Sequence, residues 1–279
     1  MTVAAIDRCI SMIELLASVS EPMELSEIAA QVGLPTSGAH RTLATLMSRG
    51  WVTQDPATQN YGLSLRMGLL AFRNLDAQYV PDVANEVLRK LAARTQEYCR
   101  LAVAENGGLT WIARAQGARH GLRYDPEMGV DVILHATATG KAWLANLPEA
   151  DALKLAYAEG FGTVEGMGPN YIRDIDTFRQ HLNSARVKGY ATAVDEGEAG
   201  ATALAVPFFS NDTPEAAMVG TISVAGPTLR VRPARYAEIS RELKLAAREL
   251  SAIWPLRIRQ RDFNMGDFST GDPKAGLGQ

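Results

Sequence analysis

Four polar side chains suited to contacting nucleic acid fall within six residues of the stretch GLPTSGAHRTLATLMSRGWV, residues 33–52. They are Thr36, Ser37, His40 and Arg41. An arginine can pair with guanine through two hydrogen bonds, a hydroxyl can reach a base edge or a phosphate, and a helix N-terminus attracts phosphate. Gly38 would leave room for a close backbone approach. The stretch therefore predicts a helix whose first turns enter the major groove of duplex DNA.

Three amphipathic helices are expected to hold these side chains in place. The first covers 5–18, the second covers 25–33 and stops at Gly33, and the third follows Pro35 and ends at Gly50. Either Thr36 or Ser37 should cap the third helix. The predicted buried stripes are Ile6, Ile10, Ile13 and Leu16 in the first helix, and Ala39, Leu43, Leu46 and Met47 in the third. Together with a two-stranded wing in 51–64, these helices form a winged helix-turn-helix.

The charge of this region is low for a domain that binds nucleic acid. The chain has 28 basic and 31 acidic residues, and residues 1–79 hold five arginines against seven acids, a net charge of −2. Because phosphate neutralisation supplies much of DNA affinity, one copy should bind duplex DNA weakly, and we predict a homo-oligomer on repeated half-sites. The residues expected to face the DNA operator are Arg8, Thr36, Ser37, Gly38, His40, Arg41, Arg49, Gln59 and Asn60. A solvated polar face and a protein-binding face are the alternatives.

The remainder of the chain has the pattern of an α+β domain with a mostly antiparallel sheet. A hairpin is expected around Asn106-Gly107-Gly108, with further strands in GLRYDPEMG (121–129), GYATAV, ATALAVPFF and AAMVGTISVAG. The helices are predicted at 65–77, 82–96, 137–147, 149–158, 174–188 and 233–254. We place a DNA-binding domain at 1–65, a linker helix at 66–82 and a second domain at 83–256. The Gly-, Asp- and Pro-rich tail, 257–279, is expected to be disordered.

Within the second domain, HATATGKA (135–142) has the pattern of an anion-binding turn. Ala138, Thr139 and Gly140 would place unpaired backbone N–H groups at the start of a helix, where a carboxylate is stabilised. The stretch predicts binding of an organic acid. An ordinary capped helix packed on the sheet is the alternative.

Several segments in a fixed order resemble the IclR-type bacterial transcription regulators. They are AIDRCISMIELLA, LSEIAAQVGLPTSGAHRTLATLMSRGWV, YGLSLRMGLLA, LHATATGKAWLA, GYATAVDEGEAGATALAVPFF and VGTISVAGP, and together they span about 4–255. The resemblance implies a winged helix-turn-helix, a linker helix and a GAF-like C-terminal domain that binds a small effector. It also implies dimers that often pair into tetramers.

The sequence departs from this family's pattern in the expected effector pocket. Ala193 and Ala203 stand where the family has Asp and Cys, and Ala225 replaces the second Ser of S-x-S-G-P, although Ser223 remains. Polar groups buried there without partners would cost about 1–3 kcal/mol each. We therefore expect an aromatic carboxylate rather than a small hydroxylated acid. Side chains considered for its charge and ring are Arg100, Arg123, Trp111 and Tyr124, with surface or core roles as the alternative.

Other classes of function receive little support. Cys9 and Cys99 lie far apart, no run reaches the roughly 18 apolar residues of a membrane span, and no cofactor or metal motif is present. A cytoplasmic protein without a cofactor is expected. An enzyme built on the α+β domain is the principal rival, with candidate groups Cys99, Asp195, Glu196, Ser223, His120, His135 and His181. None of these forms a nucleophile elbow or a metal pair, so we predict no catalysis.

Overall fold

The computed structural model describes residues 3–77, 80–105, 107–126, 132–161, 166–211, 213 and 215–255, apart from the side chains of 72 and 74–83. The chain divides into two compact units at residues 77 and 78. The tail predicted at 257–279 and the end of the strand predicted at 121–129 lie outside the described residues.

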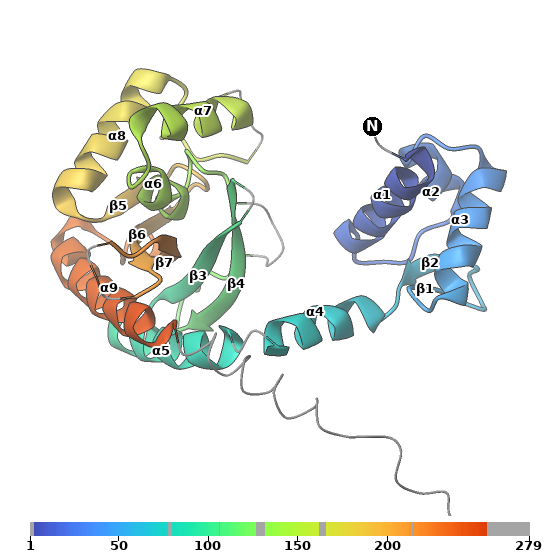
Figure 1. Ribbon diagram of the computed structural model, residues 1–279, viewed down its shortest axis with the longest axis horizontal. Coiled ribbons are helices and arrows are strands. Elements are labelled where there is room, and N and C mark those ends of the chain that lie inside the picture. Colours follow the sequence, from blue (N-terminus) through green and yellow to red (C-terminus); the bar gives the residue numbers. More distant parts are fainter. Residues whose placement is uncertain are drawn as a thin grey trace, which may run out of the picture. The chain divides into compact units, whose positions relative to one another are not determined.

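The N-terminal unit is the predicted winged helix-turn-helix followed by a further helix (Figure 1). Its elements are α1 (Ala4–Ser18), α2 (Leu25–Gln31), α3 (Thr36–Ser48), β1 (Val52–Gln54), β2 (Tyr61–Leu63) and α4 (Arg66–Ala77). Gly33 ends α2 with a φ of +67°, a conformation that glycine adopts without strain. Met23 pairs with Tyr61, which ties the α1–α2 connection to the hairpin.

Three details of this unit differ from the sequence predictions. Ile6 and Ile10 are 59% and 49% exposed, because the rest of the unit covers only the later turns of α1, where Met12 and Leu16 are buried. Met47, expected in the stripe of α3, is 36% exposed beside the buried Leu46. Neither Thr36 nor Ser37 caps α3, because the helix already begins at Thr36 and Pro35, which has no side-chain acceptor, occupies the cap position.

The C-terminal unit is a five-stranded antiparallel sheet with helices on both faces. Its strands are β3 (Tyr98–Glu105), β4 (Gly108–Gln116), β5 (Ala191–Val194), β6 (Ala201–Phe209) and β7 (Met218–Pro227), in the order β4-β3-β7-β6-β5. The helices are α5 (Val80–Thr95), α6 (Ala138–Leu144), α7 (Glu149–Glu159), α8 (Ile175–Lys188) and α9 (Pro233–Ile253). Residues 121–126 of the predicted extra strand form no strand.

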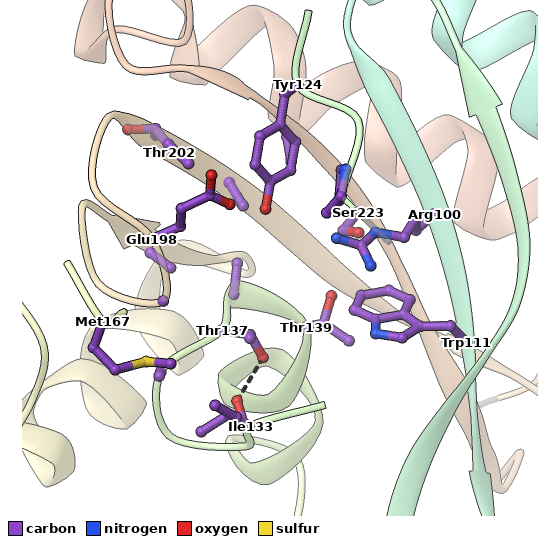
Figure 2. Close-up of a pocket in the computed structure, with 18 residues that line it drawn as sticks. Arg100, Trp111, Tyr124, Ile133, Thr137, Thr139, Met167, Glu198, Thr202 and Ser223 are labelled. Carbon is purple, nitrogen blue, oxygen red and sulfur yellow. Dashed lines mark hydrogen bonds between the residues drawn. The ribbon is translucent and has the colours of Figure 1, made fainter. Parts of the chain in front are cut away.

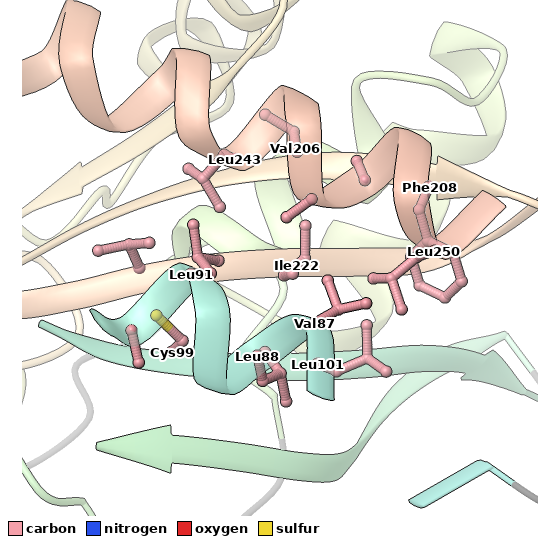
Figure 3. Close-up of a cluster of buried hydrophobic side chains, with 14 of the residues drawn as sticks. Val87, Leu88, Leu91, Cys99, Leu101, Val206, Phe208, Ile222, Leu243 and Leu250 are labelled. Carbon is pink, nitrogen blue, oxygen red and sulfur yellow. The ribbon is translucent and has the colours of Figure 1, made fainter. Parts of the chain in front are cut away.

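The two faces of the sheet carry side chains of different size. Strand alternation sends Leu101, Phe208 and Ile222 toward α5 and α9, where they form a tightly packed core with Leu88 and Leu250 (Figure 3). The opposite face, toward α6, carries smaller residues from the same strands, including Ala203, Ser223 and Ala225. Small side chains opposite a short helix leave space, and this is where the structure has a cavity.

Candidate functional site

The polar ridge at the start of α3 is exposed. We define the α3 ridge as Thr36, Ser37, His40 and Arg41, each of which is exposed in the N-terminal unit. Among the described residues, none of these four side chains forms a hydrogen bond or ion pair. The backbone N–H groups of Thr36 and Ser37 also have no partner there, because the first helical hydrogen bonds come from Gly38 and Ala39 to Pro35 O. The ridge is therefore open to an outside partner.

Gly38 lies in the first turn of α3 without a steric need for glycine. A Cβ built on it would be 3.9 Å from Pro35 Cδ, its nearest neighbour, which is an ordinary van der Waals distance. Glycine costs a helix about 0.5–1 kcal/mol relative to alanine. The packing of the protein therefore does not explain this residue.

The other predicted DNA contacts have mixed surroundings. Arg8 on α1 and Arg49 at the end of α3 are exposed. Asn60 is half-buried, and its side-chain amide donates to Pro22 O at 3.2 Å, so it fixes the wing to the α1–α2 connection. The Asp55 carboxylate accepts the N–H groups of Ala57 and Thr58, which lowers the pKa of Asp55 and shapes the wing's tip.

A cavity of about 340 Å³ lies in the C-terminal unit between the sheet and α6. Its lining comes from all five strands of the sheet, the start of α6 and the connecting segments, and Figure 2 shows the side chains around it. The lining residues are Arg100, Trp111, Tyr124, Pro126, Ile133, Ala136, Thr137, Ala138, Thr139, Met167, Ala193, Gly197, Glu198, Ala201, Thr202, Ala203, Ser223 and Ala225. This volume matches pockets that hold small ligands.

The three alanines that replace family polar residues form one continuous row of methyl groups. In the strand register Ala193 pairs with Ala203, and Ala203 pairs with Ala225, so the row crosses β5, β6 and β7. All three line the cavity. The floor of the cavity is therefore apolar at these positions.

Arg100 supplies a positive charge at the β3 side of the cavity. Its side chain is 8% exposed, and its guanidinium carbon lies 4.2 Å from the Trp111 ring centre and 5.3 Å from that of Tyr98. Among the described residues, no carboxylate pairs with it. Ser223 is its register partner on β7, and Figure 2 shows both side chains beside Trp111 and Thr139. Burying a cation without a counter-charge costs free energy.

The turn before α6 offers fewer free backbone N–H groups to the cavity than its sequence suggested. Thr137 caps the helix by accepting the Gly140 N–H at 3.0 Å, so this donor is already occupied. Ala138 and Thr139 line the cavity, whereas Gly140 packs against the backbone of Leu134. Arg123 is exposed, donates to Arg119 O, and is not among the lining residues.

Two buried polar clusters hold the walls of the cavity. Lys141 Nζ on α6 lies 2.8 and 2.7 Å from the Glu196 carboxylate oxygens and 3.2 Å from His181 Nδ1. Glu196 directly precedes the lining residue Gly197. The cluster therefore joins α6 to the 195–200 connection.

His135 forms the second of these clusters. It is 1% exposed, with Nδ1 2.6 Å from Glu159 Oε2 and Nε2 2.7 Å from Tyr171 Oη. The Glu159 carboxylate also accepts the Leu134 N–H. His135 is thus a hydrogen-bonded structural residue.

Cys99, another candidate catalytic group, is fully buried. Burial raises the pKa of its thiol to about 12, so the reactive thiolate does not form at neutral pH.

Comparison with known proteins identifies the family. A model of the IclR helix-turn-helix domain matches residues 5–56, and a model of the bacterial transcriptional regulator IclR C-terminal domain matches 72–252. The chain belongs to the IclR family of bacterial transcription regulators. As a member of this family it is a DNA-binding regulator and not an enzyme, because its relatives are transcription regulators and repressors.

Relatives align with nearly the whole IclR-family chain. The HTH-type transcriptional regulator BhcR of Paracoccus denitrificans is 32% identical over 253 residues, which are 89% of this chain and 86% of that protein. The transcriptional repressor IclR of Escherichia coli is 25% identical over 256 residues, 90% of each chain.

Solved structures share the fold. The IclR transcriptional regulator from Alicyclobacillus acidocaldarius has a TM-score of 0.74 and 25% identity, and the match covers 91% of this chain and 100% of that one. An IclR homologue from Microbacterium hydrocarbonoxydans, complexed with 4-hydroxybenzoate, has a TM-score of 0.73 and 22% identity, covering 92% and 99%. Among the described residues of the present chain, no helix is both long and apolar enough to cross a membrane.

Proposed function

We propose that this IclR-family regulator is controlled by an aromatic carboxylic acid bound in the cavity of its C-terminal unit. The observation that carries the proposal is Arg100, a buried cation that faces the cavity without a carboxylate partner among the described residues. A ligand carboxylate would supply that partner through charge-assisted hydrogen bonds. Ser223 and Thr139, also in the lining, offer hydroxyl groups beside it.

The rest of the cavity suits a ring. The alanine row offers no polar partner, and Trp111 and Ile133 add apolar wall. A small acid with several hydroxyl groups would leave these groups unpaired there, at about 1–3 kcal/mol each. The structural relative complexed with 4-hydroxybenzoate supports this choice of chemistry.

Calorimetric titration with three probes tests the ligand class. Benzoate is expected to bind roughly tenfold more tightly than benzamide, because only benzoate offers a charged acceptor to Arg100. Glycerate should bind more weakly than benzoate, because its hydroxyl groups meet methyl groups. Equal affinity for benzoate and benzamide would contradict a carboxylate site.

The α3 ridge is the proposed DNA-reading surface. Arg41 can pair with a guanine edge, Thr36 and Ser37 can reach bases or phosphates, and the two free N–H groups of the first turn suit a phosphate. Arg8 and Arg49 are exposed cations available to the DNA backbone. We assign Asn60 a supporting role, since its amide already holds the wing.

Substituting Gly38 tests this surface by separating stability from DNA binding. Gly38→Ala should raise the stability of the N-terminal unit by about 0.5–1 kcal/mol, because alanine favours the helix and fits the available space. The same methyl group should lower operator affinity by roughly tenfold if DNA backbone approaches here, through loss of one charge-assisted contact. Gly68→Ala on α4 is the matched control, since a Cβ there meets nothing within 4 Å. Thermal unfolding and gel-shift titrations measure the two effects, and unchanged operator affinity of Gly38→Ala would remove Gly38 from the DNA interface.

A homo-oligomer, a dimer or a pair of dimers, completes the proposal. The N-terminal unit has a net negative charge, so two copies on neighbouring half-sites would supply the affinity that one lacks. Exposed apolar residues in α1 and α4, or directly preceding them, offer surface for such a contact: Val3, Ile6, Ile10, Leu65, Leu69 and Leu70. Acting in the cytoplasm, the effector would favour one arrangement of the oligomer and so change the spacing of its α3 helices.

A further inference from the structure

The cavity carries a second charge, at the side opposite Arg100. Arg100 and Glu198 are the two charged residues among the described lining residues. Arg100 lies on β3 and Glu198 follows β5, and β7 and β6 lie between these strands. Figure 2 shows the two side chains on opposite sides of the cavity.

The two charges are not paired with each other or with other charged groups of the described chain. Glu198 is exposed at the edge of the cavity and forms no ion pair among the described residues. Its neighbour is Tyr124, whose pKa is raised to about 12, mainly by burial, with a further contribution from the charge and hydrogen bond of Glu198. Thr202, which lines the same side, already shares a hydrogen bond with Thr228.

This separation of charges limits which acids fit. A carboxylate held by Arg100 points the remainder of the molecule along the alanine row toward Glu198. The Glu198 carboxylate accepts hydrogen bonds, so it favours a hydrogen-bond donor on the ligand and repels a second carboxylate. The row between the two charges contributes only methyl groups.

We infer that Glu198 selects monocarboxylic aromatic acids that carry an amino or hydroxyl donor at the end remote from the carboxylate, and that it excludes dicarboxylates. The inference rests on the proposed acid-binding role of the cavity. It assigns Glu198 as the residue that determines specificity, whereas Arg100 determines that the ligand is an acid.

Titration of the full chain with benzoate, 4-aminobenzoate and benzene-1,4-dicarboxylate tests the assignment. The native protein is expected to bind 4-aminobenzoate about tenfold more tightly than benzoate, and the dicarboxylate about tenfold more weakly. Glu198→Gln should remove most of the penalty on the dicarboxylate, because it keeps the side chain's size and deletes its charge. Glu105→Gln, the same change at an exposed residue outside the cavity lining, should leave the ranking unaltered.

The outcomes distinguish the role of Glu198 from the proposed acid-binding role of the cavity. If benzoate binds but Glu198→Gln leaves the preference for the amine over the dicarboxylate unchanged, the role of Glu198 is overturned while the acid site stands. If none of the three acids binds the native protein, the aromatic-acid proposal fails and the inference fails with it.

Discussion

Arg100→Leu should weaken benzoate binding by roughly 10- to 100-fold, the range expected when charge-assisted hydrogen bonds to a buried cation are lost. Benzamide, which gains little from the charge, should bind the variant and the native protein almost equally. The free protein should lose little stability, because the substitution also removes an uncompensated charge from a site that is 8% exposed. Calorimetry and thermal unfolding measure these quantities separately.

Arg123→Leu is the matched control for this prediction. Arg123 was an equal candidate in the sequence, but its guanidinium donates to Arg119 O and does not line the cavity. Benzoate affinity should therefore be unchanged in this variant. A loss of affinity equal to that of Arg100→Leu would show that the long-range charge of the unit, rather than a contact in the cavity, governs acid binding.

The contrast between these two arginines shows what strand periodicity can predict. In CRLAVAE, Cys99 and Leu101 face the core under α5 and α9, so Arg100 must face the other side of β3. A cation on the inner face of an otherwise apolar strand therefore indicates a candidate binding site. Whether that face is covered depends on α6 and the 117–126 connection, and their placement is long-range information that β3 does not contain.

In the N-terminal unit, too, some features follow from nearby residues and others depend on residues far away in the sequence. The start and end of α3 follow from Pro35 and Gly50, which act within their own turns. The exposure of Ile6 and Ile10 does not follow from their spacing, because helical spacing gives the direction of a stripe and not the length over which a partner covers it. The sequence also does not indicate that the Asn60 amide holds the wing, because its hydrogen-bond partner Pro22 is 38 residues away.

The three alanines of the cavity lining lie next to one another in the sheet. The sequence identifies Ala193, Ala203 and Ala225 as replacements of polar family residues, and the register places them side by side on three strands. Glu198 was missed because it lies in an irregular connection, where no periodicity indicates the direction of a side chain.

Lys141→Met should destabilise the C-terminal unit by about 3–5 kcal/mol, which makes it the most damaging single substitution considered for this protein. Lys141 and Glu196 have side chains that are 1% and 3% exposed, with Nζ 2.7 Å from the nearer carboxylate oxygen. Methionine fills a similar volume but leaves the Glu196 carboxylate buried without its counter-charge. Because Glu196 holds the connection that carries Gly197 and Glu198, ligand binding should weaken as well. Denaturant unfolding followed by tryptophan fluorescence measures the loss.

An exposed ion pair with the same N···O distance provides the control. Arg179 Nε also lies 2.7 Å from a carboxylate oxygen, that of Glu149, but these side chains are 42% and 47% exposed. Water can solvate Glu149 once its partner is gone, so Arg179→Met should cost no more than about 1 kcal/mol. The double variant Lys141→Met/Glu196→Leu should recover much of the loss, because it removes both charges and leaves neither unpaired. Similar costs for Lys141→Met and Arg179→Met would mean that water reaches Glu196 and that burial does not set the strength of this pair.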